Sequence, residues 1–147
     1  MRTLAIDLGT RRVGLALSDE GARFATPYEV LAVNSHVGAV EPILSVIQKE
    51  DVKRLVVGLP LNMDDSAGPA AKQTVAWGRG LSKRAGVPVI FVDERLSSFA
   101  AEQQLIERKR GGEKITRKQK SRRLDALAAA QFLQAFLDGK LGEIEVT

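Results

Sequence analysis

Residues 3–18 read TLAIDLGTRRVGLALS, and this stretch decides the fold. Its first part, 3–7, is a short apolar run that predicts a buried strand, and 13–18 predicts a second strand after a glycine-bracketed turn. A third strand is expected within 25–33, again after a short turn. Because short turns join them, the three strands should form an antiparallel meander.

After the meander, the pattern alternates between helix and strand. Apolar residues recur at helical spacing, and two short continuous apolar runs are typical of strands in parallel sheets. The order βββαβαβαα is that of the ribonuclease H-like fold, an α/β class with a five-stranded mixed sheet and helices on both faces. The expected elements are helices over about 40–47, 69–85, 97–108 and 120–137 and strands over 54–58 and 87–92, with a loop before the last helix.

The composition narrows the class of protein. A length of 147 residues suits one domain, 1–147, and an apolar content of 44% argues against disorder. The absence of cysteine excludes thiol catalysis and cysteine-ligated metals. No apolar run reaches the roughly 18 residues of a membrane span, and the chain starts in a strand-like run with no leader pattern. We therefore expect a cytoplasmic protein with no membrane contact.

The formal charge of +4 is unevenly distributed. Residues 108–123 hold nine bases and one acid and carry +8, whereas the other 131 residues hold 13 bases and 17 acids and carry −4. A dense cationic segment favours an anionic partner, most simply nucleic acid. Aromatic residues are scarce in it, so contacts to backbone phosphate are expected rather than base stacking.

Three acids occupy unusual places. Asp7 closes the first strand, Glu94 follows the fifth, and Asp125 lies in the last helix, where Ala129 and Phe132 put it on the apolar face. In this fold the first and fifth strands flank the fourth and run parallel to it. Asp7 and Glu94 should therefore meet at one edge of the sheet, and the last helix can bring Asp125 over that edge.

Three carboxylates close together raise one another's pKa unless a cation lies between them. Mg²⁺ or Mn²⁺ suits such oxygen ligands, and two such ions can activate water and stabilise the leaving oxygen in phosphodiester hydrolysis. Taken one at a time, each acid also has an ordinary interpretation as a turn, cap or helix-start residue. Asp93 competes with Glu94, and spacing alone does not choose between them.

Four segments carry a family resemblance: IDLGTRRVG at 6–14, VGLPLN at 57–62, VDERLS at 92–97 and RLDALAA at 123–129. They resemble the YqgF family, bacterial proteins described as Holliday junction resolvases and as pre-16S rRNA processing nucleases. The resemblance covers nearly the whole chain in the right order and implies an RNase H-like fold and a metal-dependent phosphodiesterase. It places the family's acidic positions on Asp7, Glu94 and Asp125, and so favours Glu94 over Asp93. One small departure is Ser121, where many relatives have glycine.

Several polar side chains near these motifs are candidate contacts to nucleic acid. Arginine pairs bidentately with phosphate oxygens, so Arg11 and Arg12 in the first turn are plausible contacts, although a solvated hairpin tip explains them equally well. Asn62 either donates to phosphate or sugar or stabilises a turn, and Arg95 either positions Glu94 or contacts phosphate. The candidate substrate contacts are Thr10, Arg11, Arg12, Asn62, Arg95, Lys118, Lys120, Arg122 and Arg123.

His36 is the only histidine, lies outside every motif and is interpreted as a surface residue. That interpretation argues against a histidine general acid and a histidine-ligated zinc.

The sequence thus predicts a nuclease dependent on Mg²⁺ or Mn²⁺, with Asp7, Glu94 and Asp125 as metal ligands. Its expected partner is structured nucleic acid, either an rRNA precursor cut at the 5′ end of 16S rRNA or branched DNA such as a Holliday junction, bound by a monomer or a homodimer. One alternative is a nucleic-acid-binding module without catalysis. Another is an actin-like ATP-handling domain with residues 7–10 as phosphate loop, although such proteins need two domains.

Overall fold

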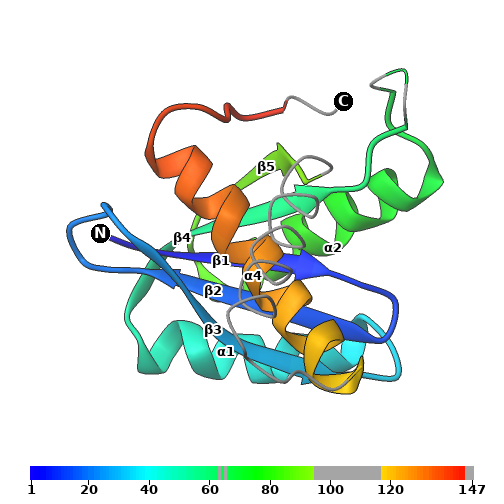
Figure 1. Cartoon of the computed structure of the whole chain (residues 1–147), viewed down its shortest axis with the longest axis horizontal. Helices are drawn as coiled ribbons and strands as arrows, with labels where there is room; N and C mark the ends of the chain where they lie inside the picture. Colours follow the sequence, from blue (N-terminus) through cyan, green and yellow to red (C-terminus); the bar gives the residue numbers. More distant parts are fainter. Residues whose placement is uncertain (63, 65, 95–116, 145–147) are drawn as a thin grey trace.

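The first 32 residues build the expected meander, and later segments add parallel strands and helices to it (Figure 1). The computed structural model describes residues 1–62, 64, 66–94 and 117–144, with side chains in the last helix described from Ala126 onward. The elements in chain order are β1 (Arg2–Leu8), β2 (Arg12–Ser18), β3 (Ala25–Ala32), the 3₁₀ helix η1 (Val37–Ala39), α1 (Val40–Lys49), β4 (Val52–Leu59), α2 (Pro69–Ala85), β5 (Val89–Asp93) and α4 (Arg117–Leu137).

The five strands form one mixed sheet in the order β3-β2-β1-β4-β5. β1 pairs with β2 and β2 with β3 antiparallel, whereas β1 with β4 and β4 with β5 are parallel. Ile6 lies beside Val57, and Gly58 lies beside Val92. The predicted sheet is confirmed, and with it the expectation that β1 and β5 flank β4 and end at the same edge.

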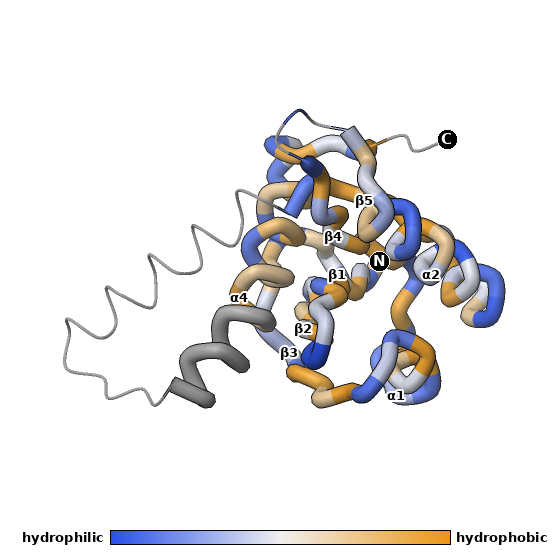
Figure 2. Tube along the Cα trace, turned by 90° about the vertical axis from the view of Figure 1, so that its right-hand side faces the viewer, coloured by the Kyte–Doolittle hydropathy of each residue, from blue (hydrophilic) through white to orange (hydrophobic). Residues whose placement is uncertain are grey.

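Helices cover both faces of the sheet, as Figure 2 shows, with α4 on one side and α1 and α2 on the other. Side chains alternate along a strand, so Leu4 and Ile6 pack toward α1 and α2, while Ala5 packs toward α4. On the α4 side the strands present small side chains, Ala5 and Ala16, opposite Ala129. Small residues on both partners let the helix lie close to the sheet, which brings α4 near the edge where β1 and β5 end.

The ends of the helices follow their sequence signals, with one correction. α2 begins at Pro69 and ends before Gly86, whose φ of 72° is left-handed, as both residues predicted. α4 begins at Arg117 and not near 120 as expected, because the run from 117 to 123 contains good helix formers and no glycine or proline. Part of the basic segment is therefore helix and not loop. The expected helix over 97–108 and the Gly111-Gly112 loop lie outside the described residues.

In the described parts of the chain, no helix is both long and apolar enough to cross a membrane.

Candidate active site

The carboxyl groups of Asp7 and Glu94 lie side by side at the edge where the parallel strands end. Asp7 follows the same alternation as Ala5, so its side chain is on the α4 side of β1. Glu94 follows β5, and its backbone N–H donates to the carbonyl of Leu59 at the end of β4, 3.4 Å away. The two carboxyl groups are joined by a hydrogen bond. The structure therefore brings together two of the three predicted acids.

Gly58 makes room for this pair. A Cβ added at Gly58 would lie 2.8 Å from the Cβ of Glu94, 2.9 Å from its Oε2 and 3.0 Å from a ring carbon of Phe132. Phe132 is fully buried in α4, so it does not move away easily. This glycine therefore has a packing role, because Glu94 and Phe132 occupy the space that a side chain here would need.

The pair is electrostatically unfavourable when both groups are ionised. Burial raises the pKa of Asp7, and its hydrogen bond with Glu94 opposes that rise. Burial, followed by the charge and hydrogen bond of Asp7 and the charge of Asp93, raises the pKa of Glu94 to about 9. Near neutral pH and without a cation, the Glu94 carboxyl therefore keeps its proton and donates a hydrogen bond to the Asp7 carboxylate.

This donor set fits a hard divalent cation. Mg²⁺ binds through one or two carboxylates and keeps several waters, so two adjacent partly buried carboxyl groups suffice to hold it. A cation placed between them would also offset the burial that raises both pKa values and the charge of Asp7 that raises the pKa of Glu94 further. Within the described residues, no group of three acidic or histidine side chains comes together. The third predicted ligand, Asp125, lies in α4 four residues before Ala129, and its side chain is outside the described part.

The turn between β1 and β2 lies next to this pair and carries the first predicted substrate contacts. Thr10 and Arg11 are exposed, and Arg12 is partly buried. Together with Gly9 these residues line a depression of about 280 Å³. The turn is tight, because the Gly9 N–H donates to the Arg12 carbonyl at 3.0 Å, and a Cβ at Gly9 would lie 2.5 Å from that oxygen.

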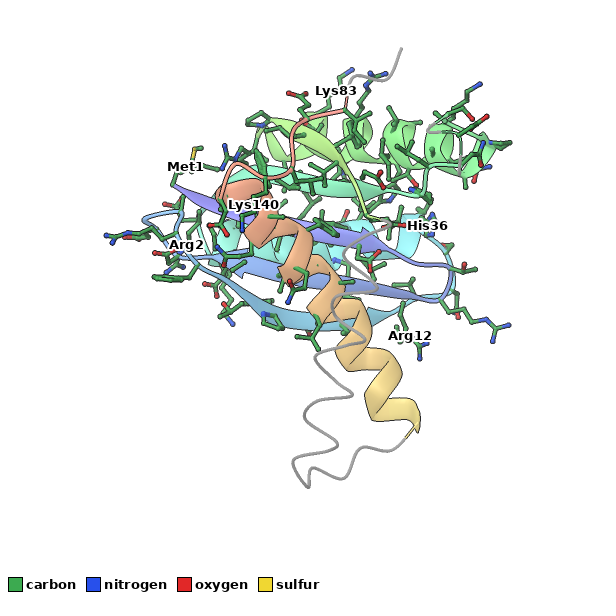
Figure 3. All side chains as sticks on the ribbon, turned by 45° about the horizontal axis from the view of Figure 1, so that its top comes forward. Met1, Arg2, Arg12, His36, Lys83 and Lys140 are labelled. Carbon is green, nitrogen blue, oxygen red and sulfur yellow. The ribbon has the colours of Figure 1, made fainter. Side chains whose placement is uncertain are left out.

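His36 braces this turn, which corrects its interpretation as a surface residue. The histidine is partly buried, and its Nε2 lies 2.9 Å from the carbonyl oxygen of Gly9. The indole Nε1–H of Trp77 in α2 donates to the carbonyl of His36 at 2.8 Å. Figure 3 shows His36 and Arg12 on the same side of the molecule, away from Met1 and Arg2. No sequence motif marked His36, because its partners are backbone carbonyls and an indole from a distant helix.

Asn62 is used inside its own loop. Its Nδ2 donates to the hydroxyl of Ser66 at 3.0 Å, and its backbone N–H donates to the Ser66 carbonyl at 2.9 Å. The Ser66 hydroxyl in turn donates to Asp64 at 2.5 Å. These contacts favour the structural interpretation of Asn62, and its contact with substrate stays a prediction.

The other predicted contacts fall on the second half of the chain. Arg95 lies outside the described residues. Lys118, Lys120, Arg122 and Arg123 belong to α4, whose backbone is described there and whose side chains are not. α4 packs mainly over β2 and β3 and also contacts β1, and these four bases lie on the helix turns that precede Asp125.

Comparison with known proteins agrees with the fold and the motifs. The chain is 41% identical over 137 residues to a protein of Acidiphilium cryptum named "Putative pre-16S rRNA nuclease", covering 93% of this chain and 84% of the relative. A Rhizobium meliloti protein of the same name is 40% identical over 133 residues, which cover 90% of this chain and 78% of the relative. Thermus thermophilus RuvC, solved with a Holliday junction, has a TM-score of 0.58 at 22% identity and covers 98% of this chain and 100% of its own.

The likeness to RuvC confirms the RNase H-like fold. The model of one family, RuvX, described as Holliday junction resolvase, matches residues 1–139. The chain therefore belongs to the RuvX (YqgF) family, and the nuclease class expected from its sequence is confirmed with that membership.

Proposed function

We propose that this protein hydrolyses phosphodiester bonds with a divalent cation held by Asp7, Glu94 and Asp125. The observation that carries the proposal is the hydrogen-bonded pair of Asp7 and Glu94 at the carboxyl ends of β1 and β5. Two half-buried carboxyl groups that repel each other are a costly arrangement for a purely structural role. Mg²⁺ or Mn²⁺ is the cation that the oxygen donors suit best.

The chain's own residues would perform three tasks. Asp7 and Glu94 would hold the cation, and Glu94 would have to lose its proton to do so. Arg11 and Arg12 hold phosphate oxygens of the substrate at the neighbouring turn. The bound ion would supply water activation and neutralisation of the charge that develops at phosphorus. The basic residues that precede Asp125 in α4 would hold the substrate backbone beside the site.

We take structured nucleic acid as the substrate. The family is described as Holliday junction resolvase, and the curated relatives are named for pre-16S rRNA. Both candidate substrates have a phosphate backbone and duplex segments, so the basic residues of the first turn and of α4 suit either one. We infer a cytoplasmic protein. A homodimer would suit paired cuts in a symmetric junction, whereas a monomer suffices to cut one end of an RNA.

A cleavage panel tests the proposal. Wild type, Asp7→Asn and Asp125→Asn would be incubated with four-way DNA junctions and with rRNA precursor fragments, each with Mg²⁺, with Mn²⁺ and with chelator. Glu29→Gln, a change of an exposed acid in β3, serves as the matched charge control. We expect metal-dependent cleavage of at least one substrate by wild type and by the control, and none by the other two variants.

Binding that falls steeply with salt, together with no cleavage of any substrate under any metal condition, would contradict the proposal and support a non-catalytic binding module. Full activity in Asp7→Asn would also contradict it.

A further inference from the structure

Helix α2 carries a second concentration of positive charge. Its 17 residues, Pro69–Ala85, hold four bases and no acid. In the sequence, no aspartate or glutamate occurs between Asp65 and Asp93. Outside α2 and the basic segment 108–123, the chain holds nine bases and 17 acids and so carries −8. The positive charge of α2 therefore contrasts with the net negative charge of the rest of the chain outside the basic segment.

Three of the four bases lie on one line of the helix. Lys72, Arg79 and Lys83 are all exposed, and spacings of seven and four residues put them on the same face. At 1.5 Å per residue the line is about 16 Å long. The fourth base, Arg84, is next to this line and pairs with Glu41 of α1 at 2.6 Å. We call Lys72, Ala76, Arg79, Gly80 and Lys83 the α2 stripe.

The positions between the bases are small. Ala76 and Gly80 are exposed, and a Cβ added at Gly80 would meet nothing within 4 Å. Among the described residues, therefore, no packing contact requires glycine at position 80, although glycine in a helix interior costs about 1 kcal/mol relative to alanine. Gly78 in the same helix differs, because a Cβ there would lie 2.8 Å from the ring of Phe91. An unexplained glycine between exposed cations permits close approach by another backbone.

We infer that the α2 stripe binds the phosphate backbone of a duplex arm of the substrate. A duplex carries one charge per about 1.7 Å of its axis, so a 16 Å row of cations spans several phosphates. The small residues let the backbone approach, and no acid of α2 opposes it. A phosphate chain meets these requirements through charge alone, without an apolar groove or a side-chain pocket.

The stripe lies apart from the contacts already described. α2 packs against β4 and β5 on the face of the sheet opposite α4. Its first turn follows the loop that leaves the carboxyl end of β4, so Lys72 is nearest the edge that holds Asp7 and Glu94, and Lys83 is farthest. Figure 3 shows Lys83 on a different side of the molecule from Arg12. The inference rests on the proposed nuclease function. It extends that function to a substrate with one duplex arm along α4 and another along α2, on the opposite face of the sheet.

Binding measurements test the stripe separately from catalysis. Affinities for a long DNA duplex, a long RNA duplex and a four-way DNA junction would be measured with chelator at several salt concentrations. The variants are Gly80→Glu and the double variant Lys72→Gln/Lys83→Gln. Their matched controls are Ser45→Glu, an equal charge change on the exposed face of α1, and Lys49→Gln/Lys140→Gln, which removes two exposed bases outside α2. Gly80→Glu gains helix propensity and meets no clash, so it tests the stripe without weakening the fold.

We expect Gly80→Glu and the double variant to bind at least one duplex probe about ten-fold more weakly, with the slope of log affinity against log salt reduced by about one to two. The controls should keep the wild-type slope. Equal affinity and slope in the stripe variants and their controls would overturn the inference. If wild type cleaves and the stripe variants bind like wild type, only the inference about the stripe is contradicted. If binding depends on the stripe but no substrate is cleaved, only the nuclease proposal is contradicted.

Discussion

The carboxyl group of Glu94 donates a hydrogen bond to that of Asp7, although Asp7 lies in β1 and Glu94 follows β5, two strands that do not pair. β4 lies between those strands, and Gly58 of β4 leaves the space that the Glu94 side chain uses. The pair therefore depends on the parallel arrangement of β1, β4 and β5 and on the lack of a side chain at Gly58. Its chemistry follows from that closeness, because two carboxyl groups so placed share a proton or a cation.

Replacing Asp7 by asparagine should abolish cleavage and preserve the fold. Asparagine keeps the size of the side chain and removes the charge that attracts a divalent cation. We expect the rate to fall at least about 100-fold, which corresponds to a loss of about 2.7 kcal/mol of transition-state stabilisation. Single-turnover cleavage and circular dichroism measure the two effects. If Asp7→Asn cleaved as fast as the control Glu29→Gln, Asp7 would have no role in catalysis.

Glu94→Gln should stabilise the metal-free protein as pH rises. The folded-state pKa of Glu94 is raised from its usual 4.5 to about 9, so the wild type loses stability as pH increases between those values. Glutamine does not titrate and imitates the protonated acid. We expect equal melting temperatures at about pH 5 and an advantage of roughly 3–8 °C for the variant at about pH 8.5, from about 1–2 kcal/mol.

Thermal melts in chelator across this range measure the effect. A wild type whose stability rises from about pH 5 to about pH 8.5 relative to Glu94→Gln would show that Glu94 is not buried against Asp7. Addition of Mn²⁺ should close most of the gap, since the ion replaces the proton.

Gly58→Ala should disturb both stability and catalysis. Its Cβ would press on Glu94 and on the buried ring of Phe132, and overpacking of this kind costs about 1–3 kcal/mol. Gly142→Ala is the matched control, because this glycine is exposed and a Cβ added there would meet nothing within 4 Å. Urea unfolding and cleavage rates measure both variants. Equal behaviour of the two would mean that Glu94 does not depend on the space at Gly58.

His36 should affect substrate binding more than the chemical step. Its Nε2 contacts the Gly9 carbonyl, so His36→Ala releases the turn that carries Arg11 and Arg12. We expect a several-fold rise in KM with kcat less changed, and recovery in His36→Gln, whose amide nitrogen can reach the same carbonyl. Steady-state cleavage kinetics separate the two constants. A fall in kcat alone, or no recovery with glutamine, would contradict a role in positioning the turn.

The sequence predicted what depends on local pattern and topology. Short apolar runs predicted the strands, Pro69 and Gly86 predicted the limits of α2, and the strand order placed Asp7 and Glu94 at one edge. The start of α4 was wrong by three residues because the density of charge suggested a loop, whereas lysine, arginine and glutamine are good helix formers.

What the sequence missed depends on contacts between distant segments. His36 gave no signal, because it acts through the backbone carbonyl of Gly9 and is held by Trp77. The need for glycine at position 58 follows only from the packing of Glu94 and Phe132 around it. The exposed line of bases on α2 also required the helix limits and the exposure of each side chain.

The most direct test of the central claim is a calorimetric Mn²⁺ titration at neutral pH, in two buffers that differ in ionisation enthalpy, with wild type, Asp7→Asn and Glu29→Gln. We expect wild type and Glu29→Gln to bind Mn²⁺ and release about one proton per ion, because Glu94 must ionise when the cation replaces its proton. Asp7→Asn should not bind. Mn²⁺ binding by Asp7→Asn with wild-type affinity, or no binding by wild type, would contradict the account.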